Sequence, residues 1–169
     1  KKEAAIALLK NKQPVAPQQL DKIAANKDYR RDLYDEMIKL KAGTLFPRKY
    51  MTQASLSESD MSLYASDDET PGLTLLGSRT ASFEGKMQKF YLYRIRFAGG
   101  DEDEDVGAPA TEYLGVAGPY AIDALNLKTT NDASGIYYKE NFDPKKMDSQ
   151  FKEYLKGVTA DKTDANEYN

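Results

Sequence analysis

The segment Phe90-Tyr91-Leu92-Tyr93-Arg94-Ile95-Arg96-Phe97 has the clearest strand pattern in this sequence, and it decides the fold class. Side chains of a β-strand alternate between its two faces, so the odd-numbered residues from Tyr91 to Phe97 share one face. That face is entirely apolar and aromatic, which is typical of a strand that packs on a core. The other face starts apolar and turns basic towards its end. The pattern predicts a strand with its aromatic face on the core and its basic end in solvent.

Segments on both sides of this strand also alternate with a period of two. Residues 73–83 predict a strand that is joined to the first by a turn at Glu84-Gly85-Lys86. Further strands are expected at residues 112–117, before Gly118-Pro119, and at residues 136–142, after a turn at residues 131–135. Residues 121–127 fit either a strand or a helical turn. Short strands with short turns predict a mostly antiparallel sheet of four or five strands.

The first third of the chain shows the spacing of amphipathic helices instead. A first short helix is expected to stop before Pro14, and a second to begin at Pro17. A third is expected over residues 28–42, with Gly43 as a left-handed stop. A fourth is expected over residues 57–65, with Ser57 as its N-cap. The apolar face of the third helix comprises Tyr29, Leu33, Met37 and Leu40.

Near the C-terminus, Asp143-Pro144 predicts the start of a closing helix and Gly157 its end. The sequence therefore predicts an α+β fold, with N-terminal helices packed on the antiparallel sheet and one C-terminal helix. The expected sections are a helical part (1–66), a β-rich part with the closing helix (67–158) and a flexible tail (159–169). The expected core comprises Leu33, Met37, Leu40, Phe46, Leu63, Leu75, Tyr91, Tyr93, Ile95, Phe97, Leu114, Val116, Ile136, Phe151 and Leu155.

The composition narrows the chemistry that the chain can perform. Its 169 residues contain no His and no Cys. The chain therefore lacks the commonest general base near neutral pH, any Ser-His or Cys-His pair, disulfides and thiolate metal sites. Most hydrolase and zinc mechanisms are excluded on this ground. No apolar run of about 18 residues exists, so the sequence predicts no membrane span.

The charge is distributed unevenly along the chain. Residues 1–50 carry 12 Lys and Arg against 6 acidic residues, whereas residues 51–169 carry 12 against 21. This asymmetry indicates two differently built halves. Because the net charge of the whole is -3, no nucleic-acid partner is expected.

Residues 24–34 (AANKDYRRDLY), residues 45–53 (LFPRKYMTQ) and Glu58-Ser59-Asp60 resemble bacterial proteins with HEAT-like helical repeats. In those proteins a helical unit leads into a Leu-Phe-Pro-x-x-Tyr connector and then into a β-rich segment. The resemblance covers about residues 20–64 and brings no catalytic residues with it. It implies a scaffold role.

The acidic segment 101–112 is the sharpest candidate site. Asp101, Asp103, Asp105 and Glu112 fall at the spacing of ligands in a twelve-residue calcium loop, and calcium is the one cofactor that the sequence suggests. The sixth position of such a loop needs a left-handed Gly, and here it is the β-branched Val106. The flanking segments are also expected strands, not helices. The alternative is a solvated hairpin loop.

Three other patterns have simpler structural explanations. Ser149 and Lys152 match the Ser-x-x-Lys spacing of Ser-Lys acyl transferases, but the match is short and Lys152 belongs to a lysine-rich helix face. The glycines of residues 115–119 lack the spacing of a phosphate-binding loop, and they indicate a close backbone approach or a bulge. Arg94 and Arg96 lie opposite the aromatic face of their strand, which argues against a base-stacking surface.

Recognition is the function that these exclusions favour. The leading hypothesis is a protein-interaction or scaffold module, part of a longer chain, with a protein partner. The alternatives are a ligand-binding domain for calcium or, through surface Tyr, for carbohydrate, and a hydrolase that uses paired carboxylates. The compartment stays open: the cytoplasm is favoured, and the periplasm or cell envelope fits if a signal was removed before Lys1.

Overall fold

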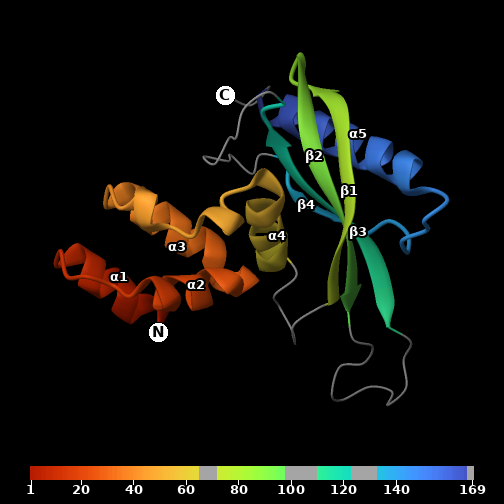
Figure 1. Ribbon diagram of the computed structural model, residues 1–169. Helices are drawn as coiled ribbons and strands as arrows, with labels where there is room; N and C mark the ends of the chain where they lie inside the picture. The colour runs from red at the N-terminus through yellow and green to blue at the C-terminus, as the bar shows by residue number, and fades with distance from the viewer. Residues whose placement is uncertain (65–71, 98–109, 123–132, 167–169) are drawn as a thin grey trace.

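The fold, described from a computed structural model, is α+β, as predicted (Figure 1). The structure describes residues 1–64, 72–97, 110–122 and 133–166, with side chains up to residue 159. Four strands form one antiparallel sheet in the order β1 (Gly72–Phe83), β2 (Lys86–Phe97), β3 (Thr111–Tyr120) and β4 (Gly135–Tyr137). Glu84 and Gly85, both with positive φ, form the expected turn between β1 and β2.

The sheet is covered on both faces, which the sequence did not predict. Phe90 and Leu92 of β2 pack against Phe151 of α5 (Met147–Asn166). Tyr93 and Ile95 of the same strand pack on the opposite face with Met61 of α4 (Gln53–Tyr64). We call these two faces the α5 side and the α4 side of the sheet. Of the even-numbered residues of β2, Phe90 and Leu92 in the middle of the strand are therefore core, whereas Lys86 at one end and Arg96 at the other are exposed.

The N-terminal helices are α1 (Lys2–Lys10), α2 (Pro17–Ala25) and α3 (Lys27–Lys39). Two single-turn helices, η1 (Gly43–Leu45) and η2 (Arg48–Tyr50), connect α3 to α4. Figure 1 shows α4 between these helices and the sheet. The helices share a separate core, whose buried members are Ala5, Ile6, Leu20, Ile23, Ala24, Leu33, Tyr34, Met37, Phe46 and Leu56.

The predicted apolar face of α3 is partly wrong. Leu33 and Met37 are buried as expected, but Tyr29 is 46% exposed and Leu40 is half-buried. Arg30, Arg31 and Tyr34 are buried instead. The reason is that α3 packs against α1, α2 and α4 at once, so its buried surface is wider than a single apolar stripe. The left-handed residue that follows the helix is Lys41 (φ 58), not Gly43.

Helix α4 begins four residues earlier than predicted. The hydroxyl of Thr52 accepts a hydrogen bond from the Ser55 backbone N–H at 3.1 Å, as an N-cap does. Ser57, the expected cap, is buried inside the helix, where its Oγ donates to the Ala54 carbonyl at 2.8 Å. Leu63, which was expected in the core, is 50% exposed.

Several other boundaries also differ from the prediction. β3 continues through Gly118-Pro119 to Tyr120, and β4 is shorter than expected. α5 begins at Met147, after a turn at residues 144–146, and not at Asp143-Pro144. It runs past Gly157 to Asn166, so the residues expected as a flexible tail are helical up to that point. Residues 65–71, 98–109 and 123–132 lie outside the described residues. They contain most of the acidic break, the acidic loop, residues 123–127 of the ambiguous segment 121–127 and the start of the turn at 131–135.

Candidate functional site

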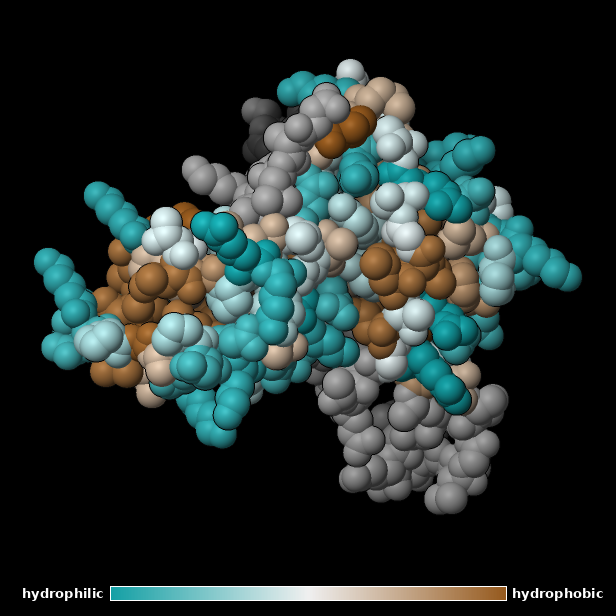
Figure 2. Space-filling view, viewed as in Figure 1, coloured by the Kyte–Doolittle hydropathy of each residue, from teal (hydrophilic) through white to brown (hydrophobic). Residues whose placement is uncertain are grey.

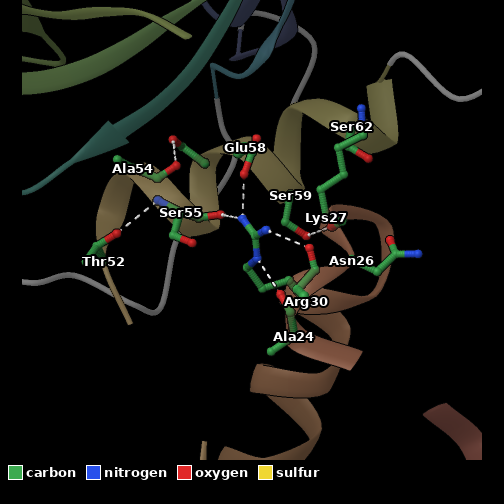
Figure 3. Close-up of polar contacts among 12 residues, drawn as sticks. Ala24, Asn26, Lys27, Arg30, Thr52, Ala54, Ser55, Glu58, Ser59 and Ser62 are labelled. Atoms are coloured by element: carbon green, nitrogen blue, oxygen red, sulfur yellow. Dashed lines mark hydrogen bonds and ion pairs between the residues drawn. The ribbon is translucent and has the colours of Figure 1, made fainter. Parts of the chain in front are cut away.

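The joint between the helices and the sheet is the most polar buried region that the structure describes. Arg30 of α3 lies at its centre, with its side chain 5% exposed (Figure 3). Its Nε donates to the Ala24 carbonyl at 2.7 Å, and its Nη1 donates to the Ser55 carbonyl at 2.7 Å and to Glu58 at 2.6 Å. The guanidinium also lies over the ring of Tyr50, 4.9 Å from its centroid. One side chain therefore ties the end of α2 to the first turns of α4.

Arg31 connects α3 to α4 and, through Asp60, to the sheet. Its Nε donates to Asp35 at 3.0 Å, and its Nη1 lies 3.8 Å from Oδ2 of the buried Asp60. The same Asp60 oxygen accepts a hydrogen bond from the Tyr120 hydroxyl of β3 at 2.9 Å. The Arg31 backbone N–H donates to Ser59 Oγ at 3.0 Å.

Two tyrosines of β2 reach α4 from the α4 side of the sheet. The Tyr93 hydroxyl lies 2.6 Å from Ser57 Oγ and donates to the Ala54 carbonyl at 3.2 Å. The Tyr91 hydroxyl donates to the Gln53 side chain at 3.2 Å. These bonds fix α4 in position and rotation on the sheet.

The electrostatics of this joint favour structure over catalysis. Burial raises the pKa of Tyr93, and burial together with the Asp60 carboxylate raises the pKa of Tyr120. Both hydroxyls therefore stay protonated at neutral pH and serve as donors. A phenol held in this way is not a general base. These hydrogen bonds therefore stabilise the packing of the helices on the sheet.

A charged groove of about 460 Å³ lies between α1 and α3. Its acids are paired with its lysines: Lys2 lies 2.8 Å from Asp32, and Lys39 lies 2.7 Å from Glu36. The hydrogen bond from Lys39 lowers the pKa of Glu36, whereas a catalytic acid needs a raised one. The groove therefore gives no support to a carboxylate hydrolase. Its lining residues are Lys2, Glu3, Ile6, Lys10, Asp32, Asp35, Glu36 and Lys39.

Of the predicted calcium ligands, Asp101, Asp103 and Asp105 lie outside the described residues. Glu112 lies on β3, where its Oε1 is 3.9 Å from Nε of Arg94. The segment is flanked by strands β2 and β3, as expected from the sequence, and not by the two helices of an EF-hand. Within the described residues, no three potential metal-binding side chains lie together.

The simpler explanations of two other patterns agree with the geometry. Ser149 Oγ donates to the Lys146 carbonyl at 2.8 Å, and Lys152 points to solvent on α5. At Gly115, a Cβ would lie 2.7 Å from both Ile95 Cδ1 and Met61 Sδ. Gly115 therefore marks the close approach of α4 to the sheet. The sequence argued against a base-stacking surface on the strand at residues 90–97. Tyr93, one of the aromatic residues of that strand, is buried beneath α4.

The outer edge of β1 is the feature that the sequence analysis missed. In the part of the chain that the structure describes, β1 pairs only with β2, so one side of this 12-residue strand is open. Its single charged side chain, Arg79, is held by Asp148 of α5 at 2.7 Å. Leu75, predicted in the core, is 48% exposed, and Figure 2 shows an apolar patch over β1. Strand order cannot be read from one sequence, so no local signal marks β1 as an edge.

The opposite edge of the sheet differs. β4 has only three residues, and it contacts both α4 and α5. Edge strands are usually protected by charge, proline or shortness. β4 is protected by its shortness, whereas β1 is long and has neither a proline nor a free charge. A bulge between Leu75 and Gly77, where Gly77 takes a φ of 132°, is the one protective irregularity on β1.

None of the helices in the described residues has the length and apolar character needed to cross a membrane. Comparison of the chain with protein-family models, with curated proteins and with solved structures finds no match in any of the three.

Proposed function

We propose that this chain is a protein-interaction module that binds an extended segment of a partner along the open edge of β1. The proposal depends on the length and chemistry of that edge. A strand with one unpaired side presents a row of backbone N–H and C=O groups, which a partner strand can satisfy. Main-chain hydrogen bonds then give affinity, and alternate side chains give specificity.

The joint around Arg30 and Asp60 supports this use of the edge. A binding surface is most effective when it needs no ordering, because loss of conformational freedom weakens association. α4 is bonded to both α3 and the sheet, so the strands are held by a well-connected layer. The edge is therefore presented to a partner in one conformation.

A phage-displayed library of random peptides, selected on the full chain, tests the proposal. We expect enriched peptides to lose most of their binding to a Leu75→Lys variant, because a lysine on the edge places a charge where the partner strand must pack. Ser82→Lys is the matched control, since Ser82 is exposed on the same side of β1 beyond the bulge. Circular dichroism should show that both variants are folded. No enrichment, or enrichment of peptides that bind the Leu75→Lys variant equally well, would refute the proposal.

The scaffold role implied by the HEAT-like resemblance concerns a different surface. Ala4, Ala7 and Leu8 lie on the outward face of α1 and are exposed. Small apolar residues at this spacing would let another helix pack closely. We propose this face as a stacking surface for a further helical unit. If a further helical unit covers this face, a Leu8→Glu substitution should lower the melting temperature of the protein that contains the unit. An unchanged melting temperature would contradict the proposal.

A further inference from the structure

The two sides of the sheet differ beside the first half of β1, and this difference selects a partner. On the α4 side, Leu73 and Leu75 lie opposite Ile95 and Tyr93 of β2. Leu75 is half exposed at the edge and Leu73 is partly buried. A segment added along β1 would therefore meet apolar surface at every second residue on this side.

On the α5 side, the same stretch of β1 lies beside two arginines. Gly72 pairs with Arg96, and Thr74 pairs with Arg94. Arg96 is exposed, and Arg94 has its side chain 42% exposed. In the described part of the chain, Arg94 forms an ion pair with one acid, Glu112 of β3, at 3.9 Å. Glu112 also lies opposite Arg96 in the strand register, so among the described residues the two arginines share one acid and this part of the sheet keeps one positive charge in excess.

The residues of β1 that separate these arginines from the open edge are small. Gly72 has no side chain, and Thr74 is short. Neighbouring strands lie about 4.8 Å apart, so an added strand would lie two spacings from β2. An arginine side chain of β2 is long enough to cross one strand, and an acidic side chain on the added strand can span the remaining distance to it. Arg96 can therefore reach a carboxylate on the segment that occupies the edge, and Arg94 can do so by turning away from Glu112 of β3.

We infer that the segment bound along the first half of β1 alternates apolar residues, which face Leu73 and Leu75, with acidic residues, which face Arg94 and Arg96. The inference rests on the proposed function and defines its partner: an extended stretch of another protein with apolar and acidic residues at alternate positions. A basic segment of the same shape would be rejected by like charge.

Four short peptides with blocked termini distinguish the charge preference from edge pairing itself. They are alternating Val-Glu, alternating Val-Lys, alternating Val-Ser, and Val-Glu with every second amide N-methylated. Binding to the full chain would be measured by fluorescence anisotropy at low and at physiological salt. We expect Val-Glu to bind more than about tenfold more tightly than Val-Lys, with Val-Ser between them. The N-methylated peptide should bind weakly, because it has the same charge but lacks main-chain donors.

Charge reversal on the protein gives the complementary test. Arg96→Glu should reverse the order of Val-Glu and Val-Lys, and Arg96→Gln should reduce the difference between them. Lys86→Glu is the matched control: Lys86 is exposed on the same strand and on the same side of the sheet, at the opposite end. It changes the net charge equally and should leave the order unchanged.

Each remaining outcome overturns a defined part of the argument. Equal binding of Val-Glu and Val-Lys refutes the acidic partner and leaves the open edge as a binding site. Equal binding of the N-methylated peptide refutes edge pairing, and with it the proposed function. Failure of every peptide to bind refutes both. A dimer in sedimentation velocity that Leu75→Lys dissociates would show that a second copy of the chain occupies the edge.

Discussion

Replacing Tyr120 and Tyr93 separately by Phe measures what holds α4 on the sheet. Each substitution removes one hydroxyl from a buried tyrosine and leaves the ring in place. The Tyr120 hydroxyl donates to the carboxylate of Asp60 at 2.9 Å, whereas the Tyr93 hydroxyl bonds to neutral partners, Ser57 Oγ and the Ala54 carbonyl. Hydrogen bonds to charged groups contribute about 1.5–3 kcal/mol, and those between neutral groups about 0.5–1.5 kcal/mol.

The two substitutions also leave different buried groups without a hydrogen-bond partner, which should widen the difference between their effects on stability. After Tyr93→Phe, Ser57 Oγ keeps its bond to the Ala54 carbonyl at 2.8 Å. After Tyr120→Phe, the buried Asp60 carboxylate loses its donor from β3 and keeps the Arg31 guanidinium at 3.8 Å. We therefore expect Tyr120→Phe to lower the free energy of unfolding by at least about 1 kcal/mol more than Tyr93→Phe.

Urea unfolding followed by far-ultraviolet circular dichroism measures both values, and equal slopes against urea would show that the unfolded states are comparable. A double-mutant cycle with Asp60→Asn isolates the Tyr120–Asp60 pair, for which we expect a coupling energy of about 1 kcal/mol or more. If Tyr93→Phe is as destabilising as Tyr120→Phe, or if the cycle gives no coupling, Asp60 does not act as a buried carboxylate acceptor. The Tyr120–Asp60 pair would then contribute no more than Tyr93 to holding α4 on the sheet.

Three further substitutions and a change of pH test other parts of the fold. Gly115→Ala should lower the free energy of unfolding by about 1–3 kcal/mol, because the new methyl group would collide with Ile95 and Met61. Gly157→Ala, inside α5 with open space around it, should raise it by about 0.5–1 kcal/mol, and urea unfolding of both variants checks the contrast. Arg30→Lys should be destabilising by about 3 kcal/mol, since an ammonium group cannot replace the fork that spans Ala24, Ser55 and Glu58; a loss below about 1 kcal/mol would contradict this. Burial, assisted by Glu153, raises the pKa of Tyr137 to about 12, above its ordinary 10.0, so its contribution to stability is complete below about pH 10 and falls as the pH rises towards 12. Thermal melts with tyrosinate absorbance should show this alkaline loss, and a melting temperature that does not fall between about pH 10 and 12 would contradict it. The tyrosines that should add to it, whose pKa values burial also raises, are Tyr34, Tyr64, Tyr93, Tyr120 and Tyr154.

The sequence predicted the type of most elements because their signals are local. The alternation at residues 90–97, the Glu84-Gly85 turn and Pro17 at the start of α2 each depend on a few neighbouring residues. The two-sided burial of β2 could not be predicted in the same way. Phe90 and Leu92 are buried only because α5, more than fifty residues later, packs over them. An apolar residue at a strand's outer face gives no indication of which distant helix will cover it.

Charged residues were the main source of error in the helical part. The predicted buried face of α3 did not include Arg30 and Arg31, and arginine is rarely buried without a partner. Their partners come from α2 and α4, at the carbonyls of Ala24 and Ser55 and the carboxylates of Glu58 and Asp60. Nothing in a local periodicity reports such pairs. For the same reason the open edge of β1 could not be predicted, because its position at the edge is a property of strand order and not of local sequence.

The composition of α4 connects the buried arginines of α3 with the edge of the sheet, neither of which the sequence predicted. A helix with one buried face shows an apolar stripe, but α4 buries Leu56 and Met61 together with Ser57, Ser59 and Asp60. It does so because it is covered on one side by α3 and on the other by the sheet, and the serines and the aspartate meet polar partners on both. A polar interface of this kind is specific in orientation, since each donor needs its own acceptor. A partner strand added to β1 would therefore extend a sheet whose orientation relative to the helices is already fixed. Loosening the joint by Tyr120→Phe should consequently weaken Val-Glu binding only as far as it unfolds the chain, whereas Leu75→Lys should abolish binding in a chain that remains folded.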